Sequence, residues 1–162
     1  MGGARGQTME SLERRMDLLR VVAPFAEVPT ALLRPVAQAA EILRFGAGEV
    51  IVRQGDLGDA VYALTEGAAE VWLENPPQQP VCLRTMRSGQ LFGETAVLYH
   101  GPRSATIKAK TEITTLKVPG PVFLEFLRST PEVALRVAVI LSQRLASDRH
   151  TLISDPTGSG EA

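Results

Sequence analysis

The sequence predicts a mainly β protein with flanking helices, built as a double-stranded β-helix (jelly-roll) barrel with N-terminal helices and two C-terminal helices. Between residues 41 and 118, short apolar segments recur at a spacing of roughly ten residues, and each is followed by Gly, Pro or Asp. Before residue 41 and after residue 121, the apolar residues follow a helical spacing instead. The 162 residues suffice for one domain with a buried core.

Residues 1–7 are rich in glycine, and we expect them to form a flexible N-terminus before a domain that spans 8–147. The domain is expected to begin with N-terminal helices over 8–40. An amphipathic helix that Pro24 ends is indicated by the spacing of Leu12, Met16, Leu19 and Val22. We expect Thr30 to cap a second short helix, and Pro35 to break it or shorten its first turn.

Residues 41–118 are predicted to form the β-roll, in which many of the glycines supply turns. The sequence Gly46-Ala47-Gly48 is not a nucleotide-binding glycine loop, because a strand rather than a helix follows it.

The C-terminal helices are predicted over 121–147, after Pro119-Gly120-Pro121 closes the β region. A short helix ends near Ser129-Thr130, and a longer one runs from Pro131 to about Ser147. The longer helix is apolar beyond one stripe, which fits either deep burial or pairing with a second copy of the chain. The polar tail, 148–162, is expected to be disordered.

Composition excludes several classes of function. The 17 basic and 18 acidic residues are evenly spread, so we expect no direct DNA binding, and no apolar run is long enough for a membrane span. The single cysteine, Cys82, and the lack of a signal peptide favour a cytoplasmic location, with Cys82 a small hydrophobic residue rather than a nucleophile. The only histidines, His100 and His150, lie far apart in sequence, so we expect no metal, no catalytic residue and no enzyme activity.

One stretch, 91–111, carries polar groups in a pattern that suits an anion. A short helix is predicted to begin near Glu94, a tight turn follows at Gly101-Pro102, and Arg103-Ser104 enters a new strand. The helix would present free N–H groups opposite the arginine, which is an arrangement that invites a phosphate.

Two segments together resemble the cyclic-nucleotide-binding domain family, which includes catabolite-activator-type regulators, regulatory subunits of cAMP-dependent kinase and cyclic-nucleotide-gated channels. Residues 92–106, Phe-Gly-Glu-Thr-Ala-Val-Leu-Tyr-His-Gly-Pro-Arg-Ser-Ala-Thr, look like the phosphate-binding cassette of that family. Residues 48–67 match its glycine pattern. The resemblance covers roughly residues 18–147 and implies cAMP or cGMP as the ligand.

The resemblance also implies roles for individual residues. Glu94 would accept a hydrogen bond from the ribose 2′-hydroxyl, and Arg103 would pair with the cyclic phosphate. The complete predicted ligand-binding set is Gly93, Glu94, Thr95, Ala96, Arg103 and Ser104, of which Thr95 and Ala96 contribute backbone N–H groups and Ser104 a hydroxyl.

Some positions depart from the family pattern or have no role in it. Thr95 stands where leucine is common, and His100 is interpreted as an exposed loop residue. Arg136 and Arg144 are candidates for the lid over the base, but each is interpreted as a surface charge.

The predicted function is a cyclic-nucleotide sensor that transmits binding through movement of its C-terminal helices to an unidentified effector protein. Pro119-Gly120-Pro121 and Ser129-Thr130-Pro131 are candidate hinges, and a homodimer through the 131–147 helix is a further possibility. The alternative is a jelly-roll module for dimerisation or docking that binds no nucleotide. A metal-dependent jelly-roll enzyme would need several inward histidines, which the chain lacks.

Overall fold

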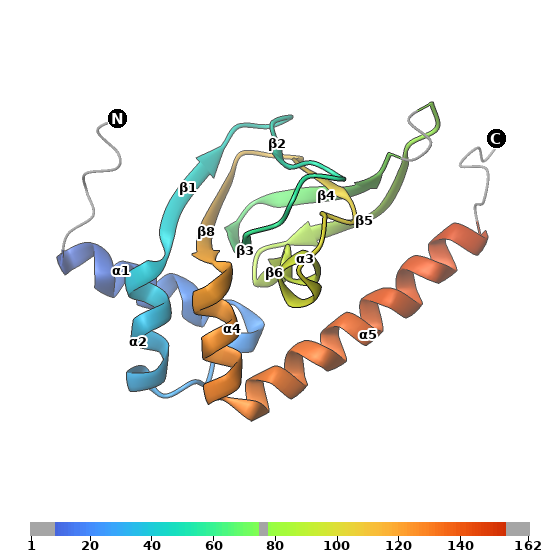
Figure 1. The fold of residues 1–162 in the computed structure, drawn as a ribbon. Helices are drawn as coiled ribbons and strands as arrows, with labels where there is room; N and C mark the ends of the chain where they lie inside the picture. Colours follow the sequence, from blue (N-terminus) through green and yellow to red (C-terminus); the bar gives the residue numbers. More distant parts are fainter. Residues whose placement is uncertain (1–8, 75–77, 155–162) are drawn as a thin grey trace.

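The structure is a computed structural model that describes residues 9–74 and 78–154 (Figure 1). Its helices are α1 (Met9–Arg20), the 3₁₀ turn η2 (Ala23–Phe25), α2 (Thr30–Ala39), α3 (Glu94–Tyr99), α4 (Gly120–Ser129) and α5 (Pro131–Ser154). Its strands are β1 (Glu41–Phe45), β2 (Val50–Val52), β3 (Ala60–Glu66), β4 (Ala68–Leu73), β5 (Val81–Arg87), β6 (Gln90–Phe92), β7 (Thr106–Ala109) and β8 (Ile113–Pro119).

The strands form two antiparallel four-stranded sheets, with the orders β1-β8-β3-β6 and β2-β7-β4-β5. This arrangement confirms the predicted jelly-roll class of mainly β structure with flanking helices. The described strands do not close into a continuous barrel, because each sheet is hydrogen-bonded only within itself. The two sheets therefore enclose a roll with open edges.

Strand β3 shows how the alternation of side chains builds two cores. Six of its seven residues are buried, although successive side chains point to opposite faces of a strand. Val61 and Ala63 face the helices, where they join a cluster that contains Phe25, Leu33, Leu116, Phe123 and Phe126. Tyr62 and Leu64 face the interior of the roll, where they join Val71, Met86, Phe92 and Ile113. The central strand is thus covered on both faces.

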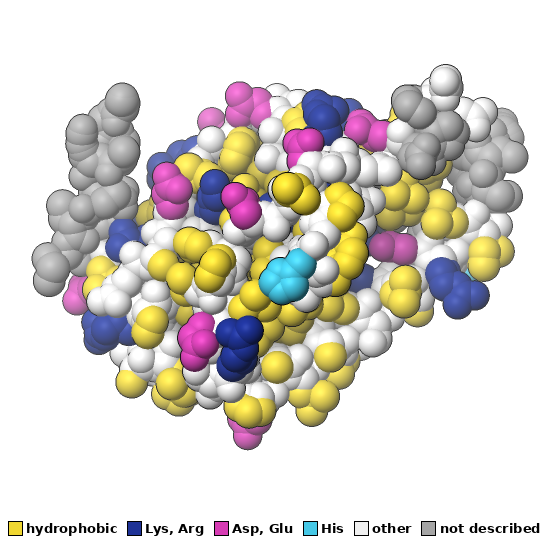
Figure 2. Space-filling view, in the orientation of Figure 1, with side chains coloured by type: hydrophobic (Ala, Val, Ile, Leu, Met, Phe, Trp, Pro, Cys, Tyr) yellow, Lys and Arg dark blue, Asp and Glu magenta, His cyan; other side chains and the backbone are white. Residues whose placement is uncertain are grey.

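Helices α1, α2 and α4 lie on one side of the roll, and the long helix α5 runs beside it (Figure 1). Helices α1, α2 and α4 pack together, and the rings of Phe25 and Phe126 lie 5.5 Å apart between their centroids. Helix α5 follows α4 after Thr130 and continues past α3 toward β5 (Figure 1). On the face shown in Figure 2, side chains of both charge signs are interspersed, as the composition predicts. Among the described helices, none is both long and apolar enough to span a membrane.

Four local predictions need correction. Thr30 does not cap α2, because Pro29 is the N-cap and the Thr30 hydroxyl accepts a hydrogen bond from Arg20 at 3.0 Å. Pro35 does not break α2, since its exposed ring removes one backbone donor while Leu33 and Val36 hold the helix to the core.

Helix α5 continues past the predicted end at Ser147 to Ser154, so residues 148–154 belong to it rather than to a disordered tail. The strand predicted to begin at Ser104, within the stretch 91–111, begins at Thr106 as β7. The predictions for residues 1–7 and 155–162 lie outside the described residues.

Candidate functional site

The site is built around α3, which has six residues, or about 1.7 turns, and begins at Glu94 as predicted. Two residues with positive φ mark its ends: Gly93 precedes it at φ 85°, and His100 follows it at φ 56°. His100 is the only non-glycine residue with positive φ in the described chain. Its side chain is exposed, as predicted, and its backbone ends the helix in the left-handed conformation usual for a glycine.

Arg103 is a buried cation that is held in place by backbone carbonyls. Only 6% of the residue is exposed, and its guanidinium donates from Nη1 to the Gly93 oxygen and from Nη2 to the Ala60 oxygen, both at 3.0 Å. The guanidinium also lies 5.8 Å from the centroid of the Tyr62 ring. Among the described residues, no carboxylate lies within ion-pair distance of Arg103. A buried charge without a counter-ion is costly, so this arginine is suited to an anionic ligand.

The Arg103 guanidinium has room in the site because two neighbouring residues are glycines without side chains. A Cβ atom at Gly93 would lie 2.7 Å from Arg103 Nη1, and one at Gly58 would lie 3.0 Å from Arg103 Cζ. A Cβ at Gly58 would also lie 2.4 Å from the Cβ of Ala96. These glycines therefore serve close packing in the site, in addition to the turns that the sequence predicts.

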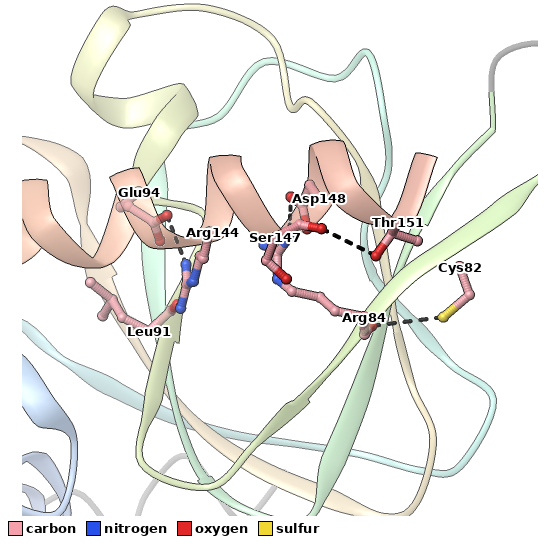
Figure 3. A network of polar contacts seen from close by, with 8 residues as sticks. All are labelled: Cys82, Arg84, Leu91, Glu94, Arg144, Ser147, Asp148 and Thr151. Atoms are coloured by element: carbon pink, nitrogen blue, oxygen red, sulfur yellow. Dashed lines mark hydrogen bonds and ion pairs between the residues drawn. The ribbon is translucent and has the colours of Figure 1, made fainter. Parts of the chain in front are cut away.

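Glu94 is buried with only 4% of its surface exposed, and it is paired with a residue fifty positions away. Arg144 of α5 donates from Nη1 to Glu94 Oε2 at 2.9 Å, and from Nη2 to the carbonyl oxygen of Leu91 (Figure 3). The side chain of Arg144 is 13% exposed, so its interpretation as a surface charge is wrong. The other oxygen, Glu94 Oε1, is buried without a hydrogen-bond partner in the described structure.

A second ion pair joins the roll to α5 one turn farther along the helix. Arg84 of β5 donates from Nη1 to Asp148 Oδ2 (Figure 3). Arg144 and Asp148 are four residues apart, so they lie on the same face of α5. This face of α5 is therefore attached to the roll at two points.

These groups border one cavity of about 450 Å³ between the roll and α5. All six predicted ligand-binding residues line it: Gly93, Glu94, Thr95, Ala96, Arg103 and Ser104. Thr95 and Ser104 are exposed, so Thr95 does not plug the core in place of the leucine common in the family. The rest of the lining includes Leu141, Leu145 and Asp148 of α5 and Leu83 and Arg84 of β5, which the sequence did not assign to the site. It also includes Arg144 of α5, which the sequence offered only as a candidate for the lid.

The signal that could have identified Arg144 lies in the spacing of α5. Val133, Val137 and Leu141 face the core, and Arg144 falls on the same face, three residues after Leu141. A charged residue on a buried stripe requires a partner. Arg136 is exposed, which agrees with its interpretation as a surface charge.

The cysteine and possible metal ligands give little support for a reactive or metal-binding site. Cys82 is partly buried, and burial, followed by the nearby Glu70 carboxylate, raises the pKa of its thiol. The described residues contain no group of three or more side chains that could hold a metal ion.

Comparisons with known proteins relate this fold and site to a protein family. Residues 42–130 match a family model described as the cyclic nucleotide-binding domain. The cAMP-dependent protein kinase regulatory subunit of Emericella nidulans is 34% identical over 70% of this chain and 26% of its own length. The cGMP-dependent protein kinase of Plasmodium berghei is 40% identical over 58% of this chain and 10% of its own length. The chain thus spans about a quarter of the first relative's length and a tenth of the second's.

Among solved structures, the regulatory domain of Toxoplasma gondii PKA, crystallised with cAMP, superposes with a TM-score of 0.71 and is 26% identical. The superposition covers 80% of this chain and 50% of that one.

Proposed function

Because this chain belongs to the cyclic nucleotide-binding domain family, we propose that it binds cAMP or cGMP in the cavity between the roll and α5, and that it acts as a regulatory domain. The observation that carries the proposal is Arg103, a buried cation that borders the cavity and has no carboxylate partner among the described residues. A cyclic phosphodiester supplies the missing negative charge. The relatives include proteins named for cAMP and for cGMP, so both nucleotides are candidates.

The proposed roles follow the positions of the side chains. The phosphate accepts hydrogen bonds from Arg103, whose bonds to two carbonyls leave further guanidinium donors for a ligand. The first-turn amides of α3, around Thr95 and Ala96, have no partner within the helix and lie beside the same cavity. Ser104 is exposed at its edge and offers a hydroxyl.

Glu94 is suited to the ribose rather than to the phosphate, because its charge would repel an anion. Its Oε1 atom is free to accept a hydrogen bond from the 2′-hydroxyl, while Oε2 retains Arg144. A bound ribose would then complete a chain of contacts from the ligand through Glu94 to α5.

We propose that this chain of contacts transmits binding to a partner. A ligand can shift α5 only through its differential affinity for two positions of the helix. The Glu94–Arg144 pair supports such a difference, because it connects α3, which borders the phosphate, with α5. Hydrogen exchange across residues 121–154, with and without nucleotide, tests the transmission, and unchanged protection would contradict it.

A second copy of the chain is the proposed partner of α5. Large apolar side chains on this helix are exposed to solvent: Leu135, Val139, Leu145, Leu152 and Ile153. Sedimentation velocity over a range of concentrations tests this point. A protein that stays monomeric at high concentration would leave the unidentified effector as the partner of this surface.

Isothermal titration with cAMP and with cGMP tests the proposed function directly. The wild-type chain should bind at least one of them, and Arg103→Ala should lose about 2–5 kcal/mol of binding free energy, as for other buried charges deprived of a partner. Arg87→Ala is the matched control, because Arg87 is exposed on β5 outside the cavity lining. A wild-type chain that takes up neither nucleotide would favour the alternative, a module for dimerisation or docking.

A further inference from the structure

Two aromatic rings, those of Tyr62 and Phe92, form a stack beside Arg103. Tyr62 of β3 and Phe92 of β6 lie directly opposite each other in the sheet, and their ring centroids are 5.1 Å apart with an interplanar angle of 6°. The Cζ atom of Arg103 lies 5.8 Å from the centroid of the Tyr62 ring. Tyr62 is only 7% exposed and is not among the residues that line the cavity, so it can affect a ligand there only through its neighbours.

Strand β3 holds the guanidinium of Arg103 at two points. Ala60 and Tyr62 are two residues apart on the same face of the strand, and the Ala60 oxygen accepts a hydrogen bond from Arg103 Nη2 at 3.0 Å. The Gly93 oxygen accepts from Nη1 at the same distance. These two hydrogen bonds alone would leave the guanidinium able to tilt about the line that joins Nη1 and Nη2. The Tyr62 ring lies beside Cζ, so it limits this tilt.

The Tyr62 ring also suits the charge of Arg103. The face of an aromatic ring carries negative potential, which attracts a cation. A carboxylate in the place of the ring would pair with the guanidinium and compete with an anionic ligand. Among the described residues, no carboxylate lies within ion-pair distance of this guanidinium. The neutral ring therefore stabilises the buried cation and leaves its remaining N–H donors for a ligand.

We propose that Tyr62 is a positioning residue for the cyclic phosphate, because it holds the guanidinium of Arg103 in the orientation that the phosphate meets. This inference rests on the proposed function. The effect belongs to the aromatic ring, since the stack with Phe92 and the contact with Arg103 both involve the ring rather than the hydroxyl. A guanidinium that is ordered in advance loses less conformational entropy on binding, and so it binds an anion more tightly.

A packing role alone would give a different set of results. Tyr62 belongs to the apolar cluster inside the roll, so removal of its ring leaves a cavity and lowers stability under either role. Only the positioning role requires that the order of the Arg103 guanidinium and the affinity for the nucleotide fall together. Phe45 of β1 offers a matched control, because it packs against the same cluster and lies outside the cavity lining.

The experiment compares the wild type with Tyr62→Phe, Tyr62→Leu, Tyr62→Met and Phe45→Leu. Nitrogen-15 relaxation of the arginine Nε–H groups measures the order parameter of the Arg103 side chain without ligand, and Arg103→Lys identifies its signal. Titration calorimetry with cAMP and with cGMP measures the affinity. Urea unfolding confirms that each variant is folded. Tyr62→Met has a flexible side chain that fills irregular space, so it takes the place of Tyr62→Leu if that variant does not fold.

The wild type and Tyr62→Phe should show an order parameter of about 0.85 at Arg103 Nε, which is typical of a rigid group, and Tyr62→Leu should fall below about 0.6. The dissociation constant of the nucleotide should rise about tenfold in Tyr62→Leu, which is the scale of one lost cation–π contact in a buried site. In Tyr62→Phe it should stay within about twofold of the wild-type value, since the ring is kept. Phe45→Leu should keep the wild-type order and affinity although it is less stable.

Three results would overturn the inference while leaving the proposed function in place. The first is a folded Tyr62→Leu or Tyr62→Met protein with wild-type order at Arg103 or wild-type affinity. The second is Tyr62→Phe with the losses of Tyr62→Leu, which would assign the effect to the hydroxyl. The third is Phe45→Leu with equal losses, which would assign the effect to a loosened core. A wild-type chain that binds neither nucleotide would instead overturn the proposed function and this inference with it.

Discussion

Arg144 donates to Glu94 across fifty positions of sequence, and the contact joins the longest α-helix to the shortest α-helix in the described structure. Both side chains are nearly buried, at 13% and 5% exposure, so solvent screens the pair only weakly. The carboxylate that is proposed to read the ribose is therefore also one of the two points at which an ion pair attaches α5.

Removal of Arg144 should cost more stability than a surface pair would. Arg144→Ala leaves the buried Glu94 carboxylate without its cation, and we expect the free energy of unfolding to fall by about 3–5 kcal/mol. Urea unfolding followed by the fluorescence of Trp72, the only tryptophan, measures this change. The double variant Glu94→Gln/Arg144→Met removes both charges and should be more stable than Arg144→Ala. A loss below about 1 kcal/mol in Arg144→Ala, the range of exposed ion pairs, would contradict the burial of this one.

Two glycines with similar backbones should respond differently to the same substitution. Gly93 and Gly48 have φ of 85° and 90°, so alanine strains either backbone by about 1–2 kcal/mol. A Cβ atom meets nothing within 4 Å at Gly48, but it lies 2.7 Å from Arg103 Nη1 at Gly93. Gly93→Ala should therefore displace the guanidinium and abolish nucleotide binding, while Gly48→Ala lowers stability and keeps the affinity. Titration calorimetry measures the nucleotide affinity of both variants and so tests this difference. Full affinity in Gly93→Ala would contradict the prediction and show that Arg103 has room to move.

His100 offers a stabilising substitution. Its φ of 56° is unfavourable for a residue with a Cβ atom and favourable for glycine, which also ends many helices in this conformation. After the larger entropy that glycine loses on folding is subtracted, His100→Gly should raise the free energy of unfolding by about 0.5–1 kcal/mol. Urea unfolding at neutral pH measures the gain. His100→Ala keeps the Cβ atom and serves as the control, which should show no gain.

The thiol of Cys82 should be less reactive at neutral pH than an ordinary cysteine. Its pKa is raised by burial first and by the Glu70 carboxylate second, so the folded protein holds less of the reactive thiolate than an ordinary cysteine. Because the folded-state pKa lies above the unfolded one, this group disfavours the folded state only as pH rises above the unfolded pKa. Alkylation by iodoacetamide should be slower in the native protein than in urea, and Glu70→Gln should accelerate the native reaction. Equal native and unfolded rates would show that the thiol is not shielded.

Local patterns in the sequence predicted the short strands and the helix at Glu94, and the resemblance to a family supplied six of the residues that line the cavity. They did so because each depends on neighbours within a few positions: the apolar spacing of a strand, the glycine of a turn, or the spacing within one loop. The attachment of Arg144 to Glu94 and of Asp148 to Arg84 depends on where α5 lies in space, and no local pattern specifies contacts across 50 and 64 positions. Pro35 shows the same limit, since its helix is held by tertiary packing rather than by local preference.

Because α5 is long, a small rotation at its junction with α4 displaces its far end by several ångströms. Thr130 alone separates the two helices; it is buried, and its hydroxyl donates to the Phe126 oxygen at 2.6 Å. From this junction the 24 residues of α5 extend roughly 36 Å, so a rotation of about 10° there would carry the far end through about 6 Å. Glu94 meets this lever arm near its middle, where a small displacement at the nucleotide would be enlarged toward Ile153 and its exposed apolar neighbour Leu152. In the proposed transmission, a displacement of α5 at Arg144 would therefore be somewhat less than twofold larger at the tip of the helix.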